Sequence, residues 1–250
     1  MKVVKKKKFE EMQLPPKVIL DPSRFIKHEG WDNSLLLPVT LSLINENNLT
    51  ICDIGGASGR FLKELLLKSN YKLLTHILDV DNYYQDKVDK NIKFINSSIL
   101  NCGIEDNSFD IVVFRHFLHH LVSNNIKNTL RIQKYALNEI FRITKNEGHI
   151  IFIEQVNEVP LFSRIVYYLS KITNKFKINF KSFDAGKVIV YFLSQKTIRK
   201  MLLEMKKSYN LEIEKEEFIH WFKHPLKWKF TILMSKIGSV FYIIKVLKED

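Results

Sequence analysis

The residues of this chain best suited to hold a ligand form a glycine-rich turn at positions 55–59. A short apolar run that contains an acid, residues 51–54 (Ile-Cys-Asp-Ile), leads into Gly-Gly-Ala-Ser-Gly and then into a helical pattern. Glycine permits positive φ angles and lets a bound molecule approach the backbone more closely than a Cβ would allow. The first N–H groups of the following helix are free to bind that molecule. The sequence therefore predicts a ligand-binding turn between a strand and a helix.

Spacing distinguishes three known loops of this kind. The phosphate-binding loop of NTPases needs a lysine after its last glycine, but here Arg60 follows Gly59. A dinucleotide-binding loop needs a small residue at its sixth position, which counted from Gly55 is again Arg60. The remaining pattern is an acid, an apolar residue and Gly-x-small-x-Gly over 53–59. This pattern resembles motif I of the class I S-adenosylmethionine-dependent methyltransferases.

A second acid stands at the distance expected for a nucleoside-binding fold. Residues 72–80 (Lys-Leu-Leu-Thr-His-Ile-Leu-Asp-Val) predict a buried strand, and Asp79 near its end lies 20 residues after Gly59. An acid about that far downstream can accept hydrogen bonds from the hydroxyls of a ribose. The resemblance implies this role for Asp79. Asp81, on the same face by strand periodicity, is the alternative.

Further segments follow in the order that the resemblance implies. Residues 92–95 predict a third strand, and residues 106–121 predict a fourth strand with the turn after it. A helix over 136–144 and a fifth strand over 149–152 flank a turn at 145–148, whose Gly148 we expect at the helix C-terminus. The resemblance implies a site for S-adenosylmethionine made of Asp53, Gly55, Gly56, Ala57 and Gly59 at the methionine end, Asp79 and Val80 at the ribose, Ser98 and Ile99 at the adenine, and Phe114 and Arg115 at the end of the fourth strand.

Histidines follow the predicted fourth strand, near the expected position of the transferred methyl group. His116 ends that strand, and His119 and His120 lie in the turn and helix after it. An acceptor that must lose a proton needs a base, and histidine titrates near neutral pH. We expect His116 or His120 to contact the acceptor as the catalytic residue, with Glu154 as the candidate carboxylate partner. One of two adjacent helical histidines must face away from the site. No metal site is expected.

Composition limits the class of protein. With 250 residues, of which 46% are hydrophobic, the chain can form one sizeable core. We expect a flexible basic arm over 1–12 and a single methyltransferase domain over 13–250, with an acceptor cap inserted at about 160–190. Two cysteines are too few for a disulfide framework, and the N-terminus lacks the apolar stretch of a secretory signal. The interpretation is a cytoplasmic enzyme without a membrane-spanning helix.

The net charge of +12 is unevenly distributed along the chain. Residues 161–250 carry 18 basic and 8 acidic residues, whereas residues 11–160 carry 16 and 18. A basic face attracts nucleic acid, anionic lipid or an acidic small molecule, or is only a solvated surface. Residues 175–183 alternate basic and apolar side chains, which puts Phe176 and Phe180 on one face by strand periodicity.

We expect a small-molecule or lipid-like acceptor, because the chain has no separate domain for recognising a macromolecule. Peripheral contact with a membrane surface is compatible with the charge. A nucleic-acid methyltransferase is the runner-up, supported by charge alone and opposed by the absence of an Asn-Pro-Pro-Tyr motif. A non-catalytic S-adenosylmethionine-binding regulatory protein is the remaining alternative, because Ala57, Ser98 and residues 146–147 depart from the family pattern. The oligomeric state is left open.

Together these patterns predict an α/β fold. The resemblance implies a Rossmann-like three-layer sandwich whose sheet has seven strands, mostly parallel, with a reversed final strand. Residues 194–205 predict an amphipathic helix with Ser194 as its N-cap. Residues 211–222 and 238–247 predict the last two strands.

Overall fold

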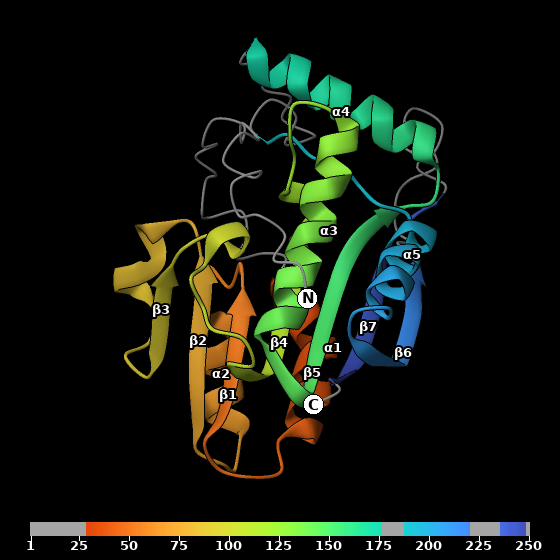
Figure 1. Cartoon of the computed structure of the whole chain (residues 1–250). Helices are drawn as coiled ribbons and strands as arrows, with labels where there is room; N and C mark the ends of the chain where they lie inside the picture. The colour runs from red at the N-terminus through yellow and green to blue at the C-terminus, as the bar shows by residue number, and fades with distance from the viewer. Residues whose placement is uncertain (1–28, 177–187, 221–235, 249–250) are drawn as a thin grey trace.

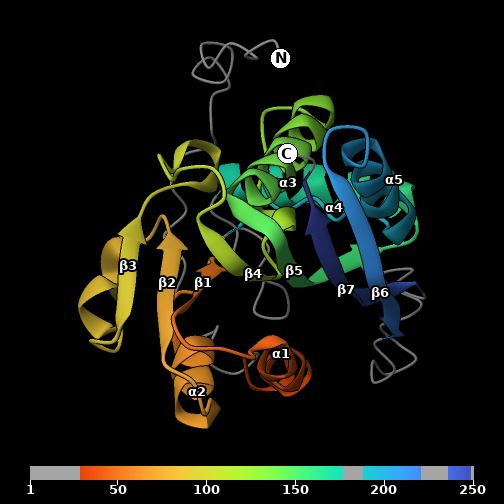
Figure 2. The same ribbon diagram turned by 60° about the horizontal axis from the view of Figure 1, so that its bottom comes forward.

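The computed structural model describes residues 29–176, 188–220 and 236–248 of the chain. These residues form one seven-stranded sheet in the order β3-β2-β1-β4-β5-β7-β6 (Figure 2). The strands are β1 (Leu49–Ile54), β2 (Leu73–Asp79), β3 (Ile92–Asn96), β4 (Phe109–Arg115), β5 (Thr144–Asn157), β6 (Asn210–His220) and β7 (Ile237–Leu247). The pairs β3-β2, β2-β1, β1-β4 and β4-β5 are parallel, and β7 is antiparallel to both β5 and β6. The predicted sheet with its reversed final strand is confirmed.

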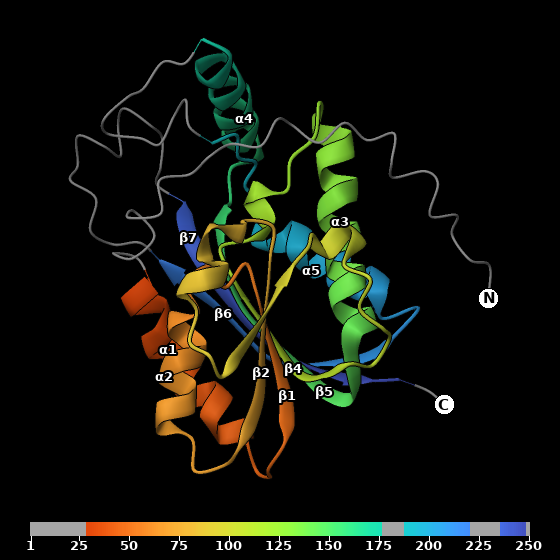
Figure 3. The ribbon, with the colours of Figure 1, turned by 90° about the vertical axis from the view of Figure 1, so that its left-hand side faces the viewer.

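Helices cover both faces of the sheet. They are α1 (Glu29–Leu43), α2 (Arg60–Lys68), α3 (Ile126–Ile143), α4 (Pro160–Lys175) and α5 (Gln195–Met205), with the short 3-10 helices η3 (Asn82–Lys87), η4 (Ile99–Asn101) and η5 (Leu118–His120). α1 and α2 lie on one face, and α3 and α5 lie on the other (Figure 2). α4 lies beyond the carboxyl ends of the parallel strands (Figures 1 and 3). None of the helices in the described ranges is long and apolar enough to cross a membrane.

Alternate side chains of the central strands enter two separate apolar cores. In β4, Val112 and Phe114 belong to the core on the α3 and α5 side, and Ile111 and Val113 belong to the core on the α1 and α2 side. Successive residues of a strand point to opposite faces, and here both faces are covered by helices. The central strands therefore read as continuous apolar runs in the sequence.

α5 forms as the sequence predicts. Ser194 is its N-cap, and the Ser194 hydroxyl accepts a hydrogen bond from the Thr197 N–H at 3.2 Å. A cap of this kind stabilises a helix by about 1 kcal/mol. The apolar positions of the predicted pattern are all buried in the core shared with α3: Ile198, Met201, Leu202 and Met205.

The turn at 145–148 differs from the prediction. α3 ends at Ile143, and the chain enters β5 at once. The pairing of β4 with β5 shifts register here, and Glu147 takes a φ of 59° within the extra residues. A Cβ on Gly148 would lie 2.8 Å from the Asp110 carbonyl oxygen. Gly148 is therefore required for close packing against β4, and the expectation that it ends the helix is wrong.

Some predictions fall on residues that the structure does not describe. These are the basic arm at 1–12 and positions 177–183 of the alternating segment. The predicted strand at 211–222 is confirmed as far as His220, where the described part of β6 ends.

The strand order reverses at β1, which pairs with β2 on one side and with β4 on the other. In open α/β sheets, ligands bind outside the carboxyl ends of the strands at such a point. The turns that follow β1, β2 and β4 leave the sheet at this edge. The fold thus brings together residues as distant in sequence as Asp53 and Arg115.

Candidate functional site

The turn after β1 is tied to the end of β2 by two hydrogen bonds. The Gly55 N–H donates to the Leu78 carbonyl oxygen at 2.8 Å, and the Ala57 N–H donates to Asp79 Oδ2 at 3.1 Å. Gly55 and Gly59 have φ angles of +70° and +72°, and Ala57 has +45°. This backbone region is accessible to glycine but uncommon for alanine. Asp79 therefore holds a strained residue of the turn in place.

The glycines of this turn are also required by the protein's own packing. A Cβ on Gly56 would lie 2.8 Å from Asp53 Oδ2, and a Cβ on Gly59 would lie 2.8 Å from Ile77 Cδ1. A Cβ on Gly55 would lie 3.3 Å from the ring of Phe117, in the turn after β4. Sequence reasoning assigned these glycines to positive φ angles and to close approach of a ligand. The structure adds close contact of the turn with β1, β2 and the segment after β4.

A buried ion pair joins β1 to β4 next to this turn. Asp53 is fully buried, and its Oδ2 accepts a hydrogen bond from Arg115 at 3.0 Å. Arg115 also donates to Asn33 Oδ1 of α1 at 2.9 Å. Burial raises the pKa of the Asp53 carboxyl, and Arg115 opposes that rise. Asp53 Oδ1 is buried without a hydrogen-bond partner in the described part of the chain, so it offers an acceptor to a bound donor.

The two acids at the end of β2 have different roles: Asp79 is the last residue of the strand, and Asp81 follows it. Asp79 accepts the Ala57 N–H through Oδ2 and the Asp81 N–H, at 2.9 Å, through Oδ1. Burial raises the pKa of the Asp79 carboxyl, whereas the two backbone hydrogen bonds oppose the rise. Asp81 instead caps η3 by accepting the Tyr83 N–H at 3.0 Å. Asp79 is therefore the acid that lies at the glycine turn, and the exposed Val80 follows it.

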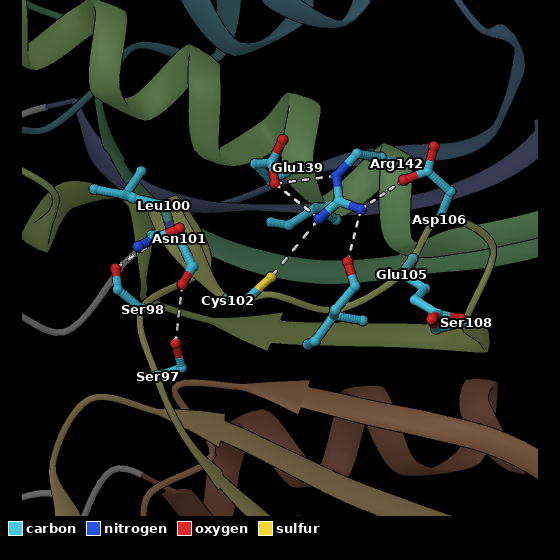
Figure 4. Close-up of polar contacts among 12 residues, drawn as sticks. Ser97, Ser98, Leu100, Asn101, Cys102, Glu105, Asp106, Ser108, Glu139 and Arg142 are labelled. Atoms are coloured by element: carbon cyan, nitrogen blue, oxygen red, sulfur yellow. Dashed lines mark hydrogen bonds and ion pairs between the residues drawn. The ribbon is translucent and has the colours of Figure 1, made fainter. Parts of the chain in front are cut away.

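Ser98 begins η4 and uses its hydroxyl as an N-cap, accepting the Leu100 N–H at 3.3 Å. The loop after η4 is held by Arg142 of α3 (Figure 4). Arg142 donates to the Ile104 carbonyl oxygen at 2.7 Å and to Asp106 Oδ1 at 2.6 Å. The segment predicted to contact the adenine is thus followed by a loop anchored to α3 through a charged side chain that the sequence did not single out.

Two of the predicted cofactor residues have their side chains in the core. Ile99 and Phe114 are buried, and the Phe114 ring stacks on Phe152 with 4.5 Å between the ring centroids. Phe114 directly precedes Arg115, whose guanidinium donates a hydrogen bond to Asp53 Oδ2. The predicted contacts of Ile99 and Phe114 with the cofactor therefore concern their main-chain atoms.

The turn after β4 is organised by one buried carboxylate, that of Glu154 in β5. Glu154 Oε2 accepts the Phe117 N–H at 2.9 Å and the Leu118 N–H at 2.7 Å. Its Oε1 accepts the Gln155 N–H at 2.9 Å and lies 2.6 Å from His119 Nδ1. Because a carboxylate only accepts hydrogen bonds, His119 carries its proton on Nδ1. Four donors therefore converge on a single side chain.

The three histidine rings of this turn form a cluster. The ring centroids of His116 and His119 lie 6.4 Å apart, and those of His119 and His120 lie 4.1 Å apart. His116 has a φ of +47° and donates its N–H to the Ile153 carbonyl oxygen at 2.8 Å. Burial, followed by the charges of His119 and His116, holds the pKa of His120 well below its usual value. The His120 ring is therefore neutral at neutral pH and a weak base.

Glu154 pairs with His119, a histidine that sequence reasoning did not select. Residues 118–120 form a 3-10 helix and not an α-helix, and the rings of the adjacent His119 and His120 lie 4.1 Å apart. The pairing follows from the register of the sheet, which the sequence does not state: Ile153 pairs with Arg115, which places Glu154 beside the turn after β4. The catalytic roles assigned to His116 and His120 stay predictions.

Residues 52–152 match the family model of a methyltransferase domain. The comparison with curated proteins found no match.

Three solved structures illustrate what the fold is similar to. A SAM-dependent methyltransferase from Methanosarcina mazei has 17% identity and a TM-score of 0.60, with 85% of this chain and 98% of that chain covered. A putative sarcosine dimethylglycine methyltransferase from Galdieria sulphuraria has 14% identity and a TM-score of 0.59, with 94% and 91% covered. The N-methyltransferase NodS from Bradyrhizobium japonicum, in complex with S-adenosyl-L-homocysteine, has 13% identity and a TM-score of 0.53, with 86% and 85% covered. At these identities the likeness concerns the fold.

Proposed function

We propose that the chain is a class I S-adenosylmethionine-dependent methyltransferase that methylates a small or lipid-like acceptor, a proposal supported by the match of residues 52–152 to a methyltransferase domain. The bound cofactor supplies a methyl group made electrophilic by its sulfonium. The protein's part is to align acceptor, methyl carbon and sulfur.

The residues at the switch point fit the cofactor. Asp53 Oδ1 is buried without a hydrogen-bond partner among the described residues, and the ammonium of a methionine moiety is a donor of the right charge. Asp79 keeps free acceptor capacity after binding two backbone N–H groups, and a ribose offers two hydroxyl donors. This unused oxygen of Asp53, next to the glycine turn, is the observation that carries the proposal for the cofactor.

The acceptor side is formed by the turn after β4 and by the segment that follows α4. The Tyr191 N–H donates to the His119 carbonyl oxygen at 3.0 Å, and the Phe192 ring lies 5.1 Å from the His119 ring. Gln133 of α3 donates to the Tyr191 carbonyl oxygen at 3.2 Å. The 160–190 insertion is thus joined, directly after its last residue, to the turn after β4 that carries the histidines. This contact supports its role as the acceptor cap. Aromatic and apolar side chains there suit a small or lipid-like molecule.

The histidines supply any base that the acceptor needs. Glu154 accepts a hydrogen bond from His119 Nδ1. The other ring nitrogen, Nε2, then carries no proton and lies on the side of the ring away from this carboxylate, where it can accept a hydrogen bond. His116 begins the turn directly at the end of β4. His120 is neutral and accepts protons weakly because of its lowered pKa. In this proposal Glu154 is a positioning residue.

The test of the cofactor site is calorimetric titration of S-adenosyl-L-homocysteine into the wild type and into Asp79→Asn. Asparagine keeps one acceptor oxygen but loses the charge, which should weaken binding by about 5- to 150-fold, from about 1–3 kcal/mol. The matched control is Asp81→Asn, because Asp81 also follows β2 but caps η3. Its affinity should stay within about threefold of the wild type.

Two results would contradict the proposal. Equal losses in the two variants would remove the special role of Asp79. Displacement of S-adenosyl-L-homocysteine by NAD or ATP at similar concentrations would show that the glycine turn recognises a different nucleotide.

A further inference from the structure

α4 carries a continuous apolar stripe on its exposed side. Its large apolar side chains that face solvent are between 40% and 64% exposed: Leu161, Ile165, Tyr168, Leu169, Ile172 and, at its end, Phe176. At about 100° per residue these positions fall within an arc of about 100° along the whole helix. Large apolar side chains are normal on a surface when they are single, but a continuous stripe marks an interaction site.

The opposite side of α4 is fixed to the protein, so the stripe has a defined direction. Tyr167 is fully buried, and its hydroxyl donates to the Ser123 carbonyl oxygen at 2.5 Å. Phe162, Ser170 and Thr173 are buried on the same side. Rotation of the helix to hide the stripe would expose Tyr167 and break its hydrogen bond. The stripe therefore faces outward in the folded protein.

The charges of α4 are all positive. Arg164, Lys171 and Lys175 lie next to the stripe on the helical wheel, and residues 160–175 contain no Asp or Glu. Lys171 donates to the Asn124 carbonyl oxygen at 2.8 Å, whereas Arg164 and Lys175 are exposed. A helix with one apolar face, basic side chains beside it and no acids has the composition of helices that lie in the interface of anionic bilayers.

We propose that α4 docks onto the surface of an anionic lipid bilayer, with its apolar stripe in the interface and Arg164 and Lys175 at the headgroups. α4 lies beyond the carboxyl ends of the parallel strands (Figures 1 and 3), on the side of the candidate site. Docking therefore brings the acceptor side of the enzyme to the lipid. The statement that docking brings the acceptor side to the lipid rests on the proposed function, but docking itself requires no cofactor and no turnover.

Charge argues against a second copy of the chain as the occupant of the stripe. A two-fold contact through α4 would bring the exposed Arg164 and Lys175 of two helices close together, and no acid of α4 could compensate them. A nucleic acid would leave the apolar stripe in water, because its affinity comes from phosphate contacts. Of these three occupants, the bilayer is the one that satisfies both the stripe and the charges.

The test is co-sedimentation of the full chain with vesicles, without cofactor. The wild type should bind vesicles of phosphatidylcholine mixed with phosphatidylglycerol, and bind phosphatidylcholine vesicles much less. Leu169→Ser with Ile172→Ser should weaken binding by about tenfold or more, because two apolar side chains no longer enter the interface. The matched control is Leu67→Ser, since Leu67 of α2 is 77% exposed on a different part of the molecule.

Charge is tested in the same way. Arg164→Gln with Lys175→Gln should weaken binding by about tenfold and reduce its dependence on salt, whereas Lys63→Gln with Lys68→Gln on α2 should change it little. The inference is overturned if the wild type stays in the supernatant, or if the Leu169 and Ile172 variant binds as the wild type does. A wild-type dimer that dissociates on the same change would also overturn it. Because this assay contains no cofactor, its outcome tests docking alone and is separate from the test of the cofactor site.

Discussion

Replacing Glu154 by glutamine should destabilise the protein strongly although the shape of the side chain is kept. Two donors converge on each carboxylate oxygen of Glu154. An amide keeps one acceptor oxygen and presents an NH2 group in place of the other. The best orientation puts the NH2 group at the Oε1 position, where it faces the Gln155 N–H, donor against donor. His119 can still adapt by changing its tautomer.

The size of the effect follows from these contacts. An unpaired N–H at Gln155 costs about 1 kcal/mol. The bonds from the Phe117 and Leu118 N–H groups lose their charged acceptor, which costs about 1 kcal/mol each. A total near 3 kcal/mol in a chain of this length lowers the melting temperature by about 6–12 °C.

The assay is thermal unfolding followed by circular dichroism at neutral pH, with Glu46→Gln as the matched control. Glu46 is exposed in the loop between α1 and β1, so its replacement should shift the melting temperature by less than about 2 °C. If Glu154→Gln also melted within 2 °C of the wild type, the carboxylate would not be the group that holds the turn after β4.

Two further predictions use the same measurement. Gly59→Ala should destabilise by about 1–3 kcal/mol more than Gly103→Ala, because both glycines have positive φ but only at Gly59 would the Cβ meet the core; equal losses would mean that backbone strain alone is measured. Burial opposes ionisation of Asp110, yet hydrogen bonds from Thr50 and Lys145 outweigh it and hold the pKa of Asp110 below its ordinary value. A lowered native pKa adds stability above the unfolded value of about 3.9 and loses it as pH falls through the native value. Asp110→Asn should therefore lower the melting temperature at neutral pH, and the difference in melting temperature between wild type and variant should disappear below about pH 4. A difference that persists there would contradict the assignment.

The fold was predictable because its central strands are covered on both faces. Residues such as 111–114 must be apolar at every position, and this signal is strong in a single sequence. α5 was equally predictable, since Ser194 and four apolar positions at helical spacing agree with each other. The turn at 145–148 was not, because the need for Gly148 arises from the carbonyl oxygen of a neighbouring strand.

The candidate site was predictable as a set of positions but not as a set of contacts. Asp53 and Asp79 could be selected from their spacing to the glycines. The partner of Asp53 depends on which strand lies beside β1, and the sequence does not state strand order. In the same way, the pairing of Glu154 with His119 depends on sheet register and on a short 3-10 helix. Contacts between distant segments are therefore what the sequence left undetermined.

The position of β7 has a consequence for how the chain reaches its native state. β7 pairs with β5 on one side and β6 on the other, although it follows both in the chain. During synthesis β5 therefore leaves the ribosome with one edge unpaired, and β6 meets β7, its one partner strand among the described residues, when residues 237–247 emerge. A strand edge whose partner has not yet been synthesised is open to pairing with another chain. The reversed strand that completes the sheet thus also determines how long the nascent protein remains prone to aggregation.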